Sequence, residues 1–174
     1  MDDILLPPEH SSNAVRLLLE AARLSENEEQ LKIKAEGILE KLCEYYHIPW
    51  NSYTYEHHFK SGNKKVDAVH GSTIIEYESP RSFNASENSR LRHARIQAEE
   101  YASLLSQEEG RHISKYSLVA WDGEAISFGC STENHFSWEP VRIFDSLCLN
   151  RLLSLIANGG RPLVSPLLLK QFIG

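Results

Sequence analysis

Residues 64–78 read KKVDAVHGSTIIEYE, and this stretch decides the fold. Two apolar runs flank a Gly-Ser pair, and Gly at the first position of a two-residue loop is typical of a β-hairpin. We therefore predict strands over 65–69 and 73–77 joined at Gly71-Ser72. With that loop, His70 pairs with Thr73 and Asp67 lies directly opposite Glu76.

The predicted hairpin carries three carboxylates on one face, because Glu78 follows Glu76 at the two-residue period of a strand. Like charges that face each other destabilise a sheet unless a divalent cation bridges them or water surrounds them. The apolar neighbours, such as Ile74 and Ile75, place the strands in the sheet interior, where unpaired carboxylates cost most. Carboxylate oxygens favour Mg²⁺ or Mn²⁺ over zinc. An exposed hairpin with a polar face is the alternative.

Helical and strand patterns alternate along the rest of the chain. Apolar residues at helical spacing, capping residues and glycines predict helices over 11–24, 27–46, 87–107 and 145–157. Alternation and turn signals predict further strands over 52–59, 116–121, 125–128 and 135–138. Pro7-Pro8 is expected to keep the first ten residues irregular. The order of elements predicts an α+β fold, an α/β sandwich with one sheet flanked by helices.

Composition limits the classes of function. The chain has 174 residues, with 18 Lys and Arg against 24 Asp and Glu, so its formal charge is −6. That charge argues against a protein that coats polyanions, but not against an enzyme with local phosphate contacts. The apolar runs are shorter than the ~20 residues of a membrane helix, and the acidic first residues differ from a signal peptide. Three scattered cysteines argue against disulfides and thiolate metal sites. We therefore expect a cytoplasmic protein without a membrane partner.

The hairpin resembles the core of the PD-(D/E)XK nucleases, because eight residues separate Asp67 from Glu76-x-Glu78. The phrase VDAVHGSTIIEYESP is similar to G-R-x-D-A-x-Y-G-x-x-x-I-E-x-K-x-P, a pattern in the N-terminal nuclease-like domain of certain restriction–modification proteins. Gln97 and Tyr101 are similar to the Q-x-x-x-Y helix motif of the RecB-like branch. LVAWDGEAISF and the final RPLVSPLLLKQFIG are similar to later parts of that domain. The resemblance divides the chain into an N-terminal extension, 1–26, with a short helix, and a nuclease-like domain, 27–174.

This resemblance implies a restriction-endonuclease-like mixed sheet and a metal site. Asp67 and Glu76 would ligate Mg²⁺ or Mn²⁺, and family members often add an acid from the preceding helix. We select Glu36 over Glu40 as that ligand, because Glu36 lies at the flank of the apolar stripe; a solvated helix residue is the alternative. Gln97 would orient the site, with Tyr101 as a DNA contact or a core residue.

One position departs from the family pattern, since Glu78 stands where most members have a catalytic lysine. Some restriction endonucleases carry Glu there and are active. Glu78 would then serve as a base or an additional ligand. Lys64, Lys65 or Arg81 would supply the missing positive charge. The same three residues and Arg90 are the expected contacts to DNA phosphates.

The resemblance thus implies a metal-dependent deoxyribonuclease of a restriction–modification or anti-phage defence system. A methyltransferase or specificity domain would lie in the same chain or a partner chain, and a homodimer is one expected assembly. The alternative is a catalytically degenerate nuclease fold that binds DNA or protein. Sequence leaves open the mode of cleavage and the recognition sequence.

Overall fold

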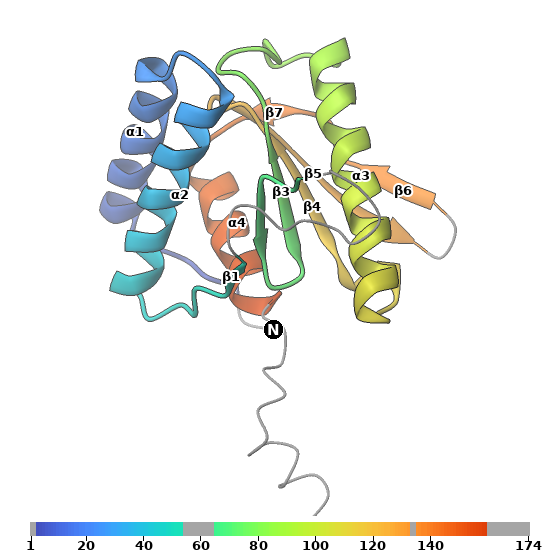
Figure 1. Cartoon of the computed structure of the whole chain (residues 1–174). Coiled ribbons are helices and arrows are strands. Elements are labelled where there is room, and N and C mark those ends of the chain that lie inside the picture. Colours follow the sequence, from blue (N-terminus) through green and yellow to red (C-terminus); the bar gives the residue numbers. More distant parts are fainter. Residues whose placement is uncertain (1–2, 54–64, 133–134, 160–174) are drawn as a thin grey trace, which may run out of the picture.

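The structure is a computed structural model that describes residues 3–53, 65–132 and 135–159. These residues form an α+β fold, as predicted, with a mixed sheet between helices (Figure 1). The helices are α1 (Pro8–Leu24), α2 (Glu28–Tyr45), α3 (Ser89–Glu109), the 3₁₀ helix η1 (Ile113–Lys115) and α4 (Ser146–Asn158). The strands are β1 (Ser52–Tyr53), β2 (Ala68–His70), β3 (Thr73–Tyr77), β4 (Ser117–Trp121), β5 (Ala125–Thr132), β6 (His135–Trp138) and β7 (Arg142–Ile143).

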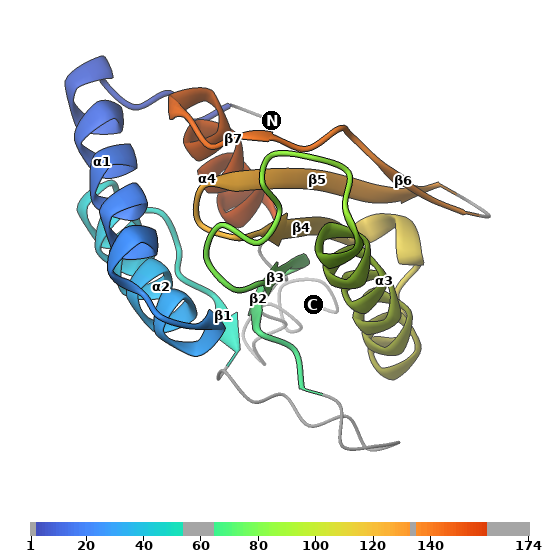
Figure 2. The same cartoon turned by 90° about the horizontal axis from the view of Figure 1, so that it is seen from above.

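The sheet has the strand order β1-β2-β3-β4-β5-β6, and β7 pairs with β5. Strands β3 and β4 are parallel, whereas the other described pairs are antiparallel. A parallel pair needs a long crossover, and α3 supplies it. Seen from above, α3 covers one face of the sheet, while α1, α2 and α4 lie on the other (Figure 2). The β3–α3–β4 unit therefore fixes the centre of the fold.

The two faces of β3 enter different parts of the core. Ile75 and Tyr77 pack with residues of α1, α2 and α4, together with Trp121. Ile74 packs on the opposite face with Leu118 and the buried side of α3. All five residues of β3 are buried, which is usual for a strand covered on both sides. Consequently, the carboxylate of Glu76 enters the fold on the face of α3.

The predicted hairpin register is confirmed. Ala68 is opposite Ile75, Val69 opposite Ile74, and His70 opposite Thr73. Gly71 has φ 61°, a left-handed conformation that glycine adopts without steric cost. The turn therefore sets the register that brings Asp67 beside Glu76.

Local signals account for most of the helix ends. The side chains of Asn27, Asn88 and Asp145 each accept a hydrogen bond from a backbone N–H in the first helical turn. Gly110 ends α3 with φ 63°. The expected irregular start was wrong at Pro8, because α1 begins there. Proline is tolerated at that position, since the first N–H of a helix has no partner within the helix.

The segment set apart as an N-terminal extension contributes to the main core. Leu6, Ala14, Leu18 and Ala22 are buried in the same cluster as residues of α2 and α4. None of the helices in the described ranges has both the length and the apolar character of a membrane span. Most of the expected 52–59 strand, Lys64 and the closing 161–174 segment lie outside the described residues.

Candidate functional site

Asp67 and Glu76 are held together by the backbone of the hairpin. The N–H of Asp67 donates to Oε1 of Glu76 at 3.3 Å, and the N–H of Tyr77 donates to Oδ2 of Asp67 at 2.9 Å. Glu76 is 2% exposed, and the side chain of Asp67 is mostly buried. The facing arrangement predicted from the turn is confirmed, and its role in metal binding stays a prediction.

Glu78 follows β3 and is also buried. Its N–H donates to the carbonyl oxygen of Trp121 at 3.0 Å, and this hydrogen bond fixes the backbone of Glu78 against β4. Its Oε2 lies 3.2 Å from Nδ1 of His93, a half-exposed side chain of α3. Glu78 is thus anchored between the sheet and α3.

Two residues of α2 that the sequence analysis did not select also reach this region. Nζ of Lys32 lies 3.9 Å from Oδ1 of Asp67 and 2.7 Å from Oε2 of Glu29, and Lys32 is 8% exposed. Glu28, one turn earlier, interacts electrostatically with Asp67 and Glu78. The signal was present in the sequence, because 28, 32 and 36 are spaced by four and flank the apolar stripe of α2.

The electrostatics of the site show an excess of negative charge. Burial and the neighbouring charge of Asp67 hold the pKa of Glu76 well above its ordinary value. Burial, then the charges of Asp67 and Glu78, raise the pKa of Glu28 from 4.5 to about 7. Burial also raises the pKa of Asp67, although the Tyr77 N–H and Lys32 partly offset it. A bound cation would relieve this repulsion.

The donor set fits a hard divalent cation. In the described ranges, no three His, Cys, Asp or Glu side chains converge closely enough to form a complete metal cage. Mg²⁺ does not require one, because it is usually held by one or two carboxylates together with water and substrate phosphates. Asp67 and Glu76 supply such a pair.

Glu36 has its hydrogen-bond partners away from this pair, and its assignment as a metal ligand stays a prediction. Its Oε1 accepts hydrogen bonds from the Tyr77 hydroxyl at 3.1 Å and from Nε2 of His70 at 3.1 Å. Tyr77 and Glu76 are adjacent on β3, so their side chains point to opposite faces. Glu36 is fully buried on the α2 face, whereas Glu40 is exposed. The sequence correctly selected Glu36 as the inward residue, but its partners are His70 and Tyr77.

The remaining expected site residues differ in their surroundings. Tyr101 is buried on α3, where burial, followed by the charges of Glu76 and Asp67, raises the pKa of its hydroxyl. Gln97 lies one turn earlier on α3 and is partly buried. The three expected phosphate contacts in the described ranges are exposed: Lys65, Arg81 and Arg90. Tyr101 is therefore coupled electrostatically to the carboxylates, whereas these basic side chains are accessible at the surface.

The raised pKa of Glu28 predicts how stability depends on pH without metal. Between pH 4.5 and about 7 the folded state binds more protons at Glu28 than the unfolded state, so the free energy of unfolding falls as the pH rises. In EDTA we expect a lower Tm at pH 8 than at pH 5, and a smaller decline in Glu28→Gln. Differential scanning calorimetry of wild type, Glu28→Gln and the exposed control Glu40→Gln checks this. An equal decline in all three would contradict it.

We compared the chain with protein-family models, with curated proteins and with solved structures, and none of the three comparisons found a match.

Proposed function

We propose that this domain hydrolyses phosphodiester bonds in DNA with Mg²⁺ or Mn²⁺ held by Asp67 and Glu76. The observation that carries the proposal is the buried carboxylate pair, which two backbone N–H groups hold in place across the hairpin. Its resemblance to the PD-(D/E)XK core and the mixed sheet around it support the same reaction class. Buried like charges destabilise the fold, and a bound cation would offset this cost by pairing with both carboxylates.

The bound cation would supply Lewis-acid stabilisation of the charge that develops on the attacked phosphate. The protein's own contribution is positional, because the N–H groups of Asp67 and Tyr77 fix the two carboxylates before substrate arrives. Glu78 would accept a proton from the attacking water, and His93 contacts its Oε2. Tyr101 is buried on α3, and its hydroxyl interacts electrostatically with Glu76 and Asp67.

Lys32 is the side chain that we propose as the missing cation. Burial lowers its pKa, but Glu29, Asp67 and Glu28 more than offset that, so the net shift is upward and the ammonium keeps its charge. Its Nζ approaches Asp67 from α2, whereas the family's lysine would come from position 78 of the hairpin. A fixed ammonium beside the carboxylate pair would stabilise negative charge in the transition state.

Replacing Lys32 tests this role. We expect Lys32→Gln to lower the rate of DNA cleavage about a hundredfold, since it removes a preorganised charge from the site. Lys34→Gln is the matched control, because Lys34 is exposed on the same helix. Single-turnover cleavage rates are measured, with circular dichroism to confirm that each variant is folded. A Lys32→Gln rate equal to that of Lys34→Gln would exclude the role.

The main test is cleavage of supercoiled plasmid, linear duplex and single-stranded DNA in Mg²⁺ or Mn²⁺, with EDTA and an RNA of matched sequence as controls. Cleavage of DNA that needs the metal supports the proposal. Intact DNA in both metals contradicts an active enzyme. Comparing the substrates also separates endonuclease from exonuclease action. The exposed side chains of Lys65, Arg81 and Arg90 would contact phosphates, so DNA binding should weaken as salt rises.

One observation favours the alternative, a nuclease fold that binds without cutting. Glu78 occupies the position at which the resemblance places a lysine, and a carboxylate cannot supply that positive charge. Salt-sensitive DNA binding with no cleavage in either metal would support this alternative. In both cases we propose a cytoplasmic role in restriction–modification or anti-phage defence, where a methyltransferase or specificity domain would supply sequence recognition.

A further inference from the structure

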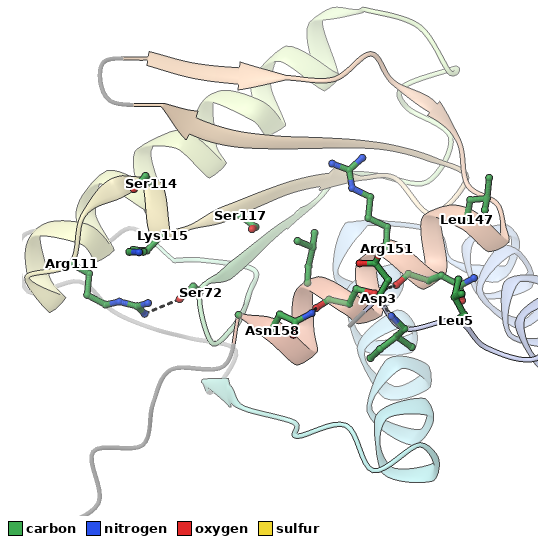
Figure 3. Close-up of a pocket in the computed structure, with 15 residues that line it drawn as sticks. Asp3, Leu5, Ser72, Arg111, Ser114, Lys115, Ser117, Leu147, Arg151 and Asn158 are labelled. Carbon is green, nitrogen blue, oxygen red and sulfur yellow. Dashed lines mark hydrogen bonds between the residues drawn. The ribbon is translucent and has the colours of Figure 1, made fainter. Parts of the chain in front are cut away.

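A hollow of about 700 Å³ lies between the N-terminal segment, the β2–β3 turn, η1, the start of β4, and α4. Figure 3 shows Ser117 between the segment that carries Arg111 and Lys115 and the helix that carries Arg151. Its volume falls within the range of small-molecule sites, about 300–1,000 Å³. It is distinct from the carboxylate pair, because Ser72 at the turn is roughly 13 Å along β3 from Glu76 at ~3.3 Å per residue.

The charges around the hollow are mostly positive, in contrast to the chain as a whole. Arg111, Lys115 and Arg151 line it, and Asp3 is the acid among the described lining residues. Two of the three cations are held in place. Arg111 donates to Oγ of Ser72 at 2.7 Å and lies 3.9 Å from Oε2 of Glu109, while Arg151 pairs with Glu139 and lies over the ring of Phe128. Lys115 is exposed at the end of η1.

The rest of the lining suits a ligand with one charged end. Hydroxyl and amide groups accompany the cations, among them Ser117 and Asn158, whereas Leu5 and Leu147 line another part and are strongly exposed. Exposed leucines beside a polar hollow provide a surface for an uncharged ring system. The hydroxyls and cations suit a phosphate, whose charge at pH 7 is about −1.5 to −2, better than a single carboxylate.

We propose that this hollow binds a phosphorylated small molecule of nucleotide size. Its phosphate contacts Arg111, Lys115 and Ser117, and its uncharged part lies against Leu5 and Leu147. This site goes beyond the proposed nuclease function and does not depend on it, because it shares no residue with the carboxylate pair. The same phosphate chemistry has two sources, a free nucleotide and the 5′-phosphate end of a strand.

Isothermal titration calorimetry with adenosine 5′-monophosphate, in EDTA, tests the site without metal at the hairpin. We expect saturable binding, weaker binding of pyrophosphate, and none of adenosine. Lys115→Gln and Arg111→Gln should each raise Kd about tenfold or more, since each removes a charge-assisted contact to the phosphate. Lys41→Gln, an exposed lysine of α2, is the control. Asp67→Asn should leave Kd unchanged, which separates this site from the proposed nuclease.

Competition by a 5′-phosphorylated oligonucleotide, but not by its unphosphorylated form, would assign the phosphate to a strand end. Competition by free nucleotide alone would assign it to a small molecule. Absence of saturable binding by both adenosine 5′-monophosphate and pyrophosphate would overturn the proposal. A Kd that is unchanged in both Lys115→Gln and Arg111→Gln would overturn it as well.

Discussion

Asp67→Asn should lower metal-dependent DNA cleavage by roughly a thousandfold, which corresponds to about 4 kcal/mol of transition-state stabilisation. The substitution removes one of two ligand charges but retains an oxygen that can accept the hydrogen bond from the Tyr77 N–H. The fold should therefore persist. Without metal, Tm at pH 8 should be equal to or higher than that of wild type, because Glu76 and Glu28 lose a repelling neighbour.

Metal-induced stabilisation gives a second measurement of the same substitution. In wild type, Mg²⁺ at 100 times its Kd should stabilise the fold by about 2.7 kcal/mol. Asp67→Asn should abolish this gain, and the exposed control Glu40→Gln should retain it. If Asp67→Asn cleaved DNA at the wild-type rate, or kept the full Mg²⁺ shift, Asp67 could not be the ligand.

Glu36→Ala should cost the fold about 3–5 kcal/mol, the second large effect that we expect. The substitution leaves Nε2 of His70 and the Tyr77 hydroxyl without their buried acceptor, and both side chains are inaccessible to water. It also opens a cavity between α2 and the hairpin. Chemical denaturation measures the loss, and Glu40→Ala on the exposed side of α2 should change stability by about 0.5 kcal/mol or less.

Glu36→Gln separates this structural role from the metal-ligand role first expected for Glu36. The amide keeps an acceptor oxygen, so its stability loss should be smaller than that of Glu36→Ala. Its Mg²⁺-induced rise in Tm should equal that of wild type, since Glu36 lies on the other face of the sheet from Glu76. A lost Mg²⁺ shift in a folded Glu36→Gln would instead support Glu36 as a metal ligand.

Much of the fold could be predicted because its signals are local. The Gly71-Ser72 turn fixes which residues of β2 and β3 face each other, and strand alternation then places Glu76 on the face of Ile74. Caps such as Asn27, and Gly110 at the end of α3, placed helix ends to within a few residues. These features depend on residues close in sequence, so they do not require knowledge of the tertiary packing.

The surroundings of α2 required the tertiary structure. The amphipathic pattern of α2 shows that Lys32 and Glu36 point inward, but not which strand residue each one meets. That pairing depends on the angle and height at which the helix crosses the sheet. The structure sets Lys32 beside Asp67 and Glu36 beside His70, although the two helix residues are only one turn apart.

The hairpin and its facing carboxylates were thus determined by the sequence itself, because turn geometry and a two-residue period act within fifteen consecutive residues. The position of the Lys32 ammonium beside Asp67 and the basic hollow around Lys115 were decided only by tertiary structure. Both combine side chains from separate elements, and the hollow takes its lining from segments as far apart as Asp3 and Asn158. Packing of helices on the sheet brings such residues together, and no local sequence pattern encodes which residues of separate elements become neighbours.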